Sequence, residues 1–202
     1  YKVLISKDAN GTGTITVTNN HMEYWGLTEE QLYETAIKNS NVLEPPSIDR
    51  LTNVMADLMR AQGMDEDIIE NQLKEDDIDM YVISNTTKAN GASVIVYSDA
   101  LQQVAENLGS DLYILPSSIH EVLALPVGNK DVDSLEEMVR CVNQTEVSPT
   151  EVLSDNVYKY DAESRTLSLA SAKAETVKET AVCEPSGYTG TVNEVARPRH
   201  HR

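Results

Sequence analysis

The stretch "GSDLYILPSSIHEVLALPVG", residues 109–128, predicts two neighbouring strands joined by a tight corner. Residues 111–115 and 120–127 are short apolar runs, which are typical of buried strands. Between them, Pro116 fixes the backbone of the corner, and the hydroxyl groups of Ser117 and Ser118 can hydrogen-bond to backbone groups in a turn. A sheet in which neighbouring strands reverse direction is therefore the first expectation for this chain.

The beginning of the chain shows the same order of strand, turn and strand, followed by a helix. Residues 1–6 and 14–18 flank Asn10-Gly11, a dipeptide typical of hairpin turns. Thr28 and Gln31 have the spacing of a capping box, which predicts a helix that runs to about Lys38.

Two more units of this kind follow later in the chain. Residues 80–84 and 92–97 flank a second Asn-Gly turn, and Ser98 begins a helix that Gly109 ends. The stretch quoted above is the third unit, and its helix begins at Ser134. A last hairpin joins residues 157–160 to residues 166–169. Repeated β-hairpin–helix units predict an α+β fold with an antiparallel or mixed sheet and with helices mainly on one face.

We expect a single domain over residues 1–170 that contains an acidic helical insert at about residues 45–79. In the insert, Ser47 is the expected cap of a helix over residues 48–62, and a short second helix follows. Residues 171–202 are rich in small and polar residues without apolar periodicity, so they predict a flexible polar tail. The chain begins at Tyr1 inside a strand pattern, which suggests that a further N-terminal region exists in the complete protein.

The charge of the chain restricts its partners. The net charge is −17, and residues 1–170 carry 11 basic and 29 acidic side chains. Nucleic acids bind to clustered lysine and arginine, so this composition argues against a nucleic-acid partner and against an anionic membrane surface. A basic protein partner fits the charge, and mimicry of a polyanion is an alternative.

Cysteine usage and hydropathy indicate a cytoplasmic protein without a bound metal or other cofactor. Cys141 and Cys183 are far apart and have no metal-ligand spacing. Two unclustered cysteines are typical of a reducing compartment, and the sequence contains neither a signal peptide nor an apolar run long enough to span a membrane.

Three groups of residues are candidates for a site. Ser118, His120 and Glu121 bring a hydroxyl, an imidazole and a carboxylate together, as a hydrolase or transferase needs, but no nucleophile elbow or oxyanion loop accompanies them. His21 and Glu23 are two residues apart, so they can be metal ligands on one face of a strand, although no third ligand is near. Tyrosines on strands can line a binding surface or fill half-buried sheet faces. The tyrosine candidates are Tyr113, Tyr158 and Tyr160.

Several motifs occur in the order found in an uncharacterised protein family. "NNHMEYWGLTEEQLYETAIKN", "MYVISNTTKANGASVIVY", "LGSDLYILPSSIHEVLALPV" and "VLSDNVYKYD" resemble the C-terminal part of the family called domain of unknown function 5688, from gut Clostridia and other Firmicutes. The resemblance covers roughly residues 1–166 and implies no known activity, cofactor or catalytic residue.

Taken together, these features favour a non-enzymatic domain that binds a protein partner. A hydrolase or transferase that uses residues 117–121 is the alternative enzyme hypothesis. The sequence leaves the oligomeric state open.

Overall fold

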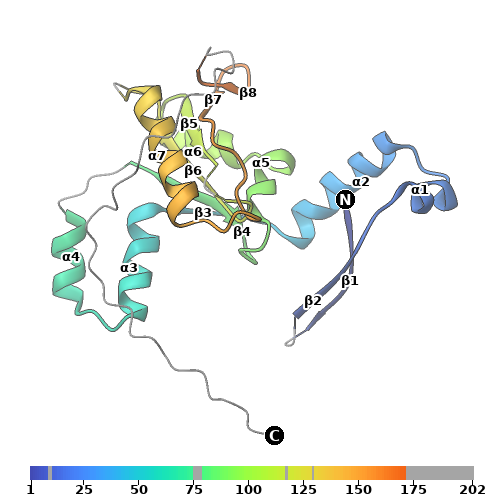
Figure 1. Cartoon of the computed structure of the whole chain (residues 1–202), viewed down its shortest axis with the longest axis horizontal. Helices are drawn as coiled ribbons and strands as arrows, with labels where there is room; N and C mark the ends of the chain where they lie inside the picture. The colour runs from blue at the N-terminus through green and yellow to red at the C-terminus, as the bar shows by residue number, and fades with distance from the viewer. Residues whose placement is uncertain (9–10, 75–78, 117, 129, 172–202) are drawn as a thin grey trace, which may run out of the picture. The chain divides into compact units, whose positions relative to one another are not determined.

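A six-stranded antiparallel sheet, in the order β3-β4-β6-β5-β7-β8, carries most of the core in the computed structural model of this chain (Figure 1). The structure describes residues 1–8, 11–74, 79–116, 118–128 and 130–171. The predicted α+β class with an antiparallel sheet is confirmed. The six strands are β3 (Pro46–Arg50), β4 (Tyr81–Asn85), β5 (Leu112–Leu115), β6 (Val122–Pro126), β7 (Tyr158–Asp161) and β8 (Thr166–Leu169).

Helices cover both faces of this sheet, and not mainly one face as the sequence predicts. Two connections explain the difference. The chain passes from β4 to β5 through α6 (Ala100–Leu108) and skips β6, and it passes from β6 to β7 through α7 (Val132–Thr145) and skips β5. Both connections move in the same direction along the sheet, but they start from antiparallel strands. Crossovers of the same hand therefore place α6 and α7 on opposite faces.

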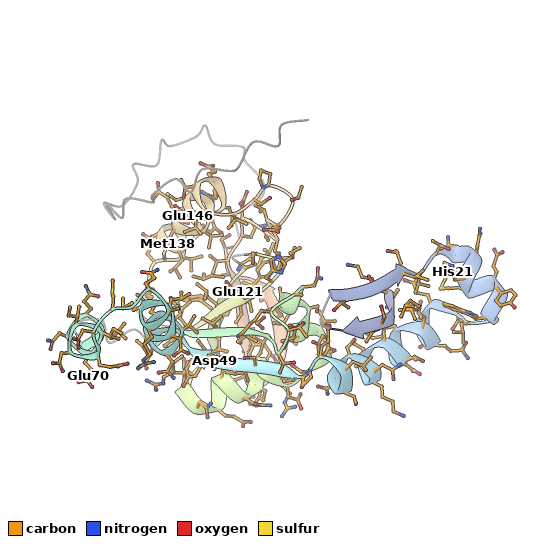
Figure 2. The ribbon with its side chains drawn as sticks, turned by 90° about the horizontal axis from the view of Figure 1, so that it is seen from below. His21, Asp49, Glu70, Glu121, Met138 and Glu146 are labelled. Atoms are coloured by element: carbon orange, nitrogen blue, oxygen red, sulfur yellow. The ribbon has the colours of Figure 1, made fainter. Side chains whose placement is uncertain are left out.

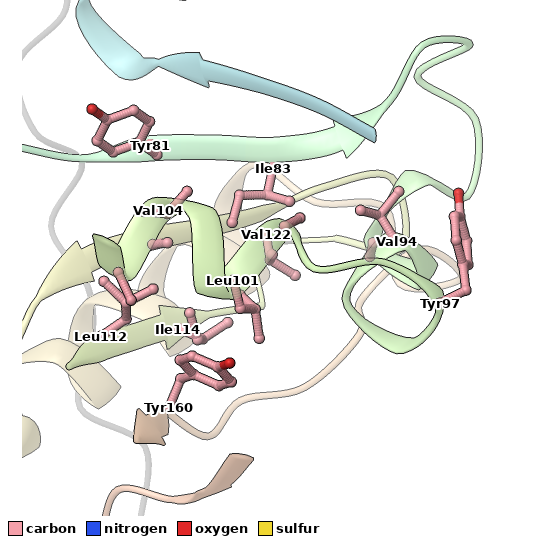
Figure 3. Close-up of a cluster of buried hydrophobic side chains, with 14 residues drawn as sticks. Tyr81, Ile83, Val94, Tyr97, Leu101, Val104, Leu112, Ile114, Val122 and Tyr160 are labelled. Carbon is pink, nitrogen blue, oxygen red and sulfur yellow. The ribbon is translucent and has the colours of Figure 1, made fainter. Parts of the chain in front are cut away.

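Alternate residues of the strands supply the two halves of the core. Figure 3 shows the half beneath α6, where Leu101 and Val104 pack against the strand residues Ile83, Ile114 and Val122. The other half contains Leu135 and Val139 of α7. Its strand residues include Tyr113, Leu115 and Leu125. A strand that is buried on both faces has no polar alternation, which is why the quoted stretch is so apolar.

The second predicted hairpin does not form. Residues 92–97 lie in a 3-10 turn, Gly91–Ser93, followed by the short helix α5 (Val94–Tyr97). Both edges of β4 are already paired, one with β3 and the other with β6, so no edge is left for a strand from these residues. The three predicted units are therefore not equivalent, although Gly109 ends α6 in the left-handed conformation as predicted.

The N-terminal hairpin forms as predicted and makes a separate two-stranded sheet. Its strands are β1 (Lys2–Asp8) and β2 (Gly11–Thr16), and Asp8 pairs with Gly11. The turn residue Asn10 lies outside the described residues. The helix α2 (Glu29–Leu43) begins with the predicted capping box, because Thr28 and Gln31 exchange hydrogen bonds. It is longer than predicted, and its partly buried Ile37 packs against the core.

An additional helix, α1 (Asn19–Trp25), occupies residues for which the sequence predicts no helix. The backbone N–H of Thr18 donates a hydrogen bond to Nδ1 of His21 at 3.0 Å, which caps the start of this helix. Gly26 ends the helix in the left-handed conformation. Thr18 at the N-cap and Gly26 at the C-cap are the local signals for α1.

The predicted insert holds two helices, but it begins with a strand. Pro46–Arg50 forms β3, so Ser47 caps no helix, and α3 (Leu51–Ala61) starts after Arg50. The short second helix is present as α4 (Glu66–Lys74). In α7 the cap is Asp131 and not Ser134, because the Asp131 carboxylate accepts a hydrogen bond from the Ser134 backbone at 3.1 Å.

Within the described ranges, no helix is both long and apolar enough to cross a membrane. Residues 172–202, which include Cys183 and nearly all of the predicted tail, lie outside those ranges.

Candidate functional site

The corner between β5 and β6 uses Ser118 to hold its own backbone. The Ser118 hydroxyl accepts a hydrogen bond from the backbone N–H of His120 at 3.1 Å, and the Ser118 side chain is nearly buried. Ser117 lies outside the described residues. The Ser118 hydroxyl therefore stabilises the turn, as serine does in many tight turns, because it bonds a backbone group rather than an imidazole.

The imidazole of His120 faces two groups that are distant in sequence. Its Nδ1 accepts a hydrogen bond from the backbone N–H of Asn90 at 3.2 Å, and its Nε2 lies 3.5 Å from a carboxylate oxygen of Glu151. A ring that accepts at Nδ1 carries its proton on Nε2 when it is neutral, and this proton points toward Glu151. Both ring nitrogens are thus engaged, Nδ1 by Asn90 and Nε2 by Glu151, whereas the Ser118 hydroxyl bonds the His120 backbone.

Backbone contacts reinforce the same junction. The buried Ser84 hydroxyl donates to the carbonyl oxygen of His120 at 2.7 Å, and the Ile119 N–H donates to the carbonyl of Glu151 at 2.8 Å. Glu151 and Asn90 are partners that the sequence does not reveal, because each is about 30 residues from His120 and has no local pattern. Glu121, the third residue of the predicted cluster, is half-buried directly before β6.

A buried asparagine shapes the loop that carries Asn90. Asn85 is fully buried, and its amide donates to the Ala89 carbonyl at 3.0 Å and to the Glu44 carboxylate at 3.1 Å. Lys88 and Asn90 both adopt positive φ angles, of 56° and 51°. Such angles are uncommon outside glycine and persist where surrounding contacts fix the backbone, as the Asn85 bonds do here.

The predicted metal ligands His21 and Glu23 lie on a helix and not on a strand. Residues two apart on a helix are separated by about 200° around its axis, so these side chains leave α1 in nearly opposite directions. The ring of His21 stacks on Trp25 with centroids 5.5 Å apart. Within the ranges that the structure describes, no group of three or more potential ligands surrounds a metal position.

The three tyrosine candidates do not share one face. Tyr113 belongs to the half of the core beneath α7, whereas Tyr160 is buried beneath α6 and Tyr158 packs on that same side. The Tyr160 hydroxyl donates to the Gln102 side chain at 2.9 Å, and burial raises the pKa of this phenol. Only Tyr158 and Tyr160 can therefore belong to a common surface.

An exposed apolar surface on the N-terminal hairpin is the clearest candidate for a contact site. Four hairpin side chains and two from α1 line a hollow of about 220 Å³. We call this the arm surface, and it consists of Val3, Ile5, Ile15, Val17, His21 and Trp25. Figure 2 shows His21 on α1. Ile5 is 61% exposed, and α1 contains no buried residue at all.

Sequence comparison places the chain in a family without an established function. Residues 1–162 match the family of unknown function DUF5688. No curated protein and no solved structure gives a significant match. Because the match covers most of the 202 residues, the chain belongs to the DUF5688 family, whose function is unknown.

Proposed function

We propose that this chain is a non-enzymatic protein-binding domain that contacts its partner through the arm surface. The observation that supports this most directly is the exposure of aliphatic and aromatic side chains around one hollow. Trp25 is 43% exposed and Ile15 is 50% exposed, and neighbouring Tyr24 is 88% exposed. Clustered exposed apolar side chains mark interaction sites, and tryptophan and tyrosine contribute strongly to binding energy.

The stability of the hairpin gives a second reason for a partner. A two-stranded sheet on its own is only marginally stable in water, because one face buries little apolar area. β1 and β2 pair only with each other among the described strands, and their apolar residues Val3 and Ile15 face one another across the pair. A bound segment that covers this face would stabilise the hairpin.

The charge distribution supports a partner that carries positive charge. Residues 1–27 contain two basic and two acidic side chains, whereas residues 28–170 contain nine basic and 27 acidic side chains. Residues 1–27, which carry the arm surface, therefore have no net charge and repel neither an acidic nor a basic partner. The strongly acidic remainder of the domain attracts a positively charged partner. We expect a protein segment with an apolar anchor residue and with lysine or arginine beside it, which binds faster at low salt.

A pull-down from extracts of the cells that naturally produce the protein tests this proposal. The bait is the full chain in three versions: wild type, an arm variant and a matched control. The arm variant carries Ile5→Lys and Ile15→Lys. The matched control carries Met138→Lys and Leu153→Lys, whose native side chains are exposed to a similar extent, 46% and 44%. The protein that wild type and control recover is then purified and titrated against each version.

The proposal predicts a protein that wild type and control bind with equal affinity and that the arm variant binds at least tenfold more weakly. Equal binding by the arm variant and the control, or no protein that binds wild type after purification, contradicts it. Circular dichroism of each variant verifies that the fold is intact.

A further inference from the structure

β8 ends the six-stranded sheet with an edge that no other described strand covers. All four of its residues are exposed, and Leu167 and Leu169 are 41% and 55% exposed. The strand at the opposite edge, β3, carries Pro46, Asp49 and Arg50. Proline and charge are the usual means by which edge strands avoid pairing with other chains. β8 has neither, since its sequence is Thr-Leu-Ser-Leu.

The hydrogen bonds between β7 and β8 show which backbone groups of β8 point outward. Ala170 N–H donates to the carbonyl of Val157, so these two residues form a hydrogen-bonded pair. Hydrogen-bonded and non-hydrogen-bonded pairs alternate along an antiparallel ladder. Leu169, opposite Tyr158, and Leu167, opposite Tyr160, are therefore in non-hydrogen-bonded pairs. Their N–H and C=O groups point away from β7 and have no partner among the described residues.

We infer that β8 pairs antiparallel with β8 of a second copy of this chain, about a twofold axis at Ser168. In this register Leu167 lies opposite Leu169 of the second copy, and the reverse pair is equivalent by symmetry. The outward groups of the two leucines form four hydrogen bonds between the copies, and the same surface serves both copies, as a twofold interface requires.

The side chains on the α6 side complement one another in this register. Leu167 is the cross-strand neighbour of Tyr160, and Leu169 is the neighbour of Tyr158. Pairing with a second copy continues each row, so that tyrosine, leucine, leucine and tyrosine follow one another across the interface. Apolar cross-strand neighbours of this kind stabilise a sheet. No charged residue lies within the paired strands, so no like charges oppose each other there.

The size of the interface and the charge of the chain determine its strength. A strand of four residues contributes much less area than the roughly 800 Å² per partner of stable complexes, so the dimer forms only at raised protein concentration. Each copy carries a net charge of −17, and salt screens the repulsion between the copies. The dimer is therefore stronger at high salt, opposite to the binding proposed for the arm surface.

A disulfide between copies tests the register. In a full chain that carries Cys141→Ser and Cys183→Ser, the Ser168→Cys variant places the two new cysteines in a non-hydrogen-bonded pair. Their Cα atoms are then about 4.5 Å apart, within disulfide range. The control is Thr166→Cys, on the same face of the same strand. The register separates its two cysteines by about four residues, or about 13 Å.

Mild oxidation of Ser168→Cys is expected to give a covalent dimer on a non-reducing gel, and Thr166→Cys is expected to remain monomeric. Monomeric Ser168→Cys, or equal amounts of dimer in both variants, overturns the inference.

Sedimentation velocity tests the non-covalent dimer in 0.5 M NaCl. The wild-type sedimentation coefficient is expected to rise with concentration, and that of Leu167→Lys with Leu169→Lys is expected to stay at the monomer value. Leu167→Lys with Leu169→Glu puts opposite charges across the axis and is expected to restore association. A wild type that stays monomeric, or a double-lysine variant that still associates, overturns the inference. The arm variant described above keeps its dimer, so the two proposals fail independently.

Discussion

At the scale of single residues, Gly91 shows how tightly the junction beside β4 is packed. A Cβ atom at this position would collide with the Ser84 side chain, the His120 carbonyl and the Asn85 backbone nitrogen. Two of these three neighbours are backbone atoms, which cannot move without disturbing β4 and the corner. Glycine is required here by space and not by its φ angle.

We therefore expect Gly91→Ala to lower the free energy of unfolding by about 1–3 kcal/mol, the usual cost of overpacking. Gly128→Ala is the control, because a Cβ atom there meets nothing within 4 Å. Urea denaturation followed by circular dichroism measures both. Equal urea midpoints for Gly91→Ala and Gly128→Ala would show that the backbone around Gly91 moves aside at little cost in stability.

His120 gives a second prediction at this scale. His120→Ala removes the acceptor of the Asn90 N–H and the partner of Glu151, so we expect a loss of about 1 kcal/mol of stability. Glu121→Ala should change stability by less than about 0.5 kcal/mol. Chemical denaturation of both variants decides this, and a His120→Ala variant as stable as wild type would remove the structural role of the ring.

The carboxylate of Asp111 makes stability depend on acid. A hydrogen bond from the Ala162 backbone and the Lys159 ammonium group, 2.9 Å away, lower the pKa of Asp111. A carboxyl group with a lowered folded-state pKa stabilises the fold above its unfolded-state pKa of about 4, and this contribution is lost as the pH falls through the lowered value. Asp111→Asn should therefore flatten the fall in stability below pH 4, as urea titrations at pH 2–6 can measure. An unchanged acid profile would contradict this.

At the scale of elements, the start of α7 shows why a capping residue can be misplaced from sequence. Ser134 and Glu137 have the spacing of a capping box, but Asp131 has an equally suitable side chain three residues earlier and takes the position. Its carboxylate also accepts from the Ser134 hydroxyl at 2.9 Å. Both serine and aspartate are good caps, so local preference alone does not decide between them.

Asp131→Ala is expected to cost about 1 kcal/mol of stability, and Ser134→Ala clearly less, because only the first substitution removes the acceptor for the backbone of the first turn. Thermal denaturation of the two variants provides the comparison. A larger loss of stability for Ser134→Ala than for Asp131→Ala would indicate that Ser134 is the N-cap, as the sequence predicts.

The helices and strands also show which parts of the fold local sequence patterns can predict. The hairpin β1–β2, the α2 cap, the β5–β6 pair and the β7–β8 pair all follow from turn residues and apolar patterns. Residues 92–97 contain valine, isoleucine and tyrosine, which favour strands, yet they are helical because β4 has no free edge. The partners of His120 could likewise not be predicted from the local sequence, because only the fold brings Asn90 and Glu151 to the ring.

At the scale of the whole molecule, the excess of acidic side chains acts on the folded state itself. Residues 1–170 hold 29 acidic and 11 basic side chains, and compaction brings these like charges together. Ion pairs such as Arg60–Glu66 at 2.7 Å and Arg140–Glu136 at 2.9 Å neutralise only some of them. Sodium chloride screens the remaining repulsion.

We expect the thermal midpoint to rise as sodium chloride increases from 0.05 to 0.5 M. A gain of about 1 kcal/mol corresponds to a shift of about 2–4 °C for a domain of this size. Scanning calorimetry at several salt concentrations measures the shift, with sodium sulfate avoided because it stabilises proteins by exclusion from their surface. A midpoint that falls with salt would mean that attractive pairs outweigh the repulsion.

The connections from β4 to β5 and from β6 to β7 each skip one strand of the sheet. The sheet therefore cannot be separated between two of these four strands without breaking the chain. Any line drawn between β4 and β7 cuts at least one covalent connection, whether through α6, through α7 or through the β5–β6 corner. A chain divided between Leu108 and Gly109 would leave β4 without β6, and α6 would lose Ile114 and Val122 from the core beneath it. We expect that neither half folds by itself, because each holds only part of the sheet. Each half would still carry strands that pair with those of the other, so we expect the two halves to reassemble when they are mixed.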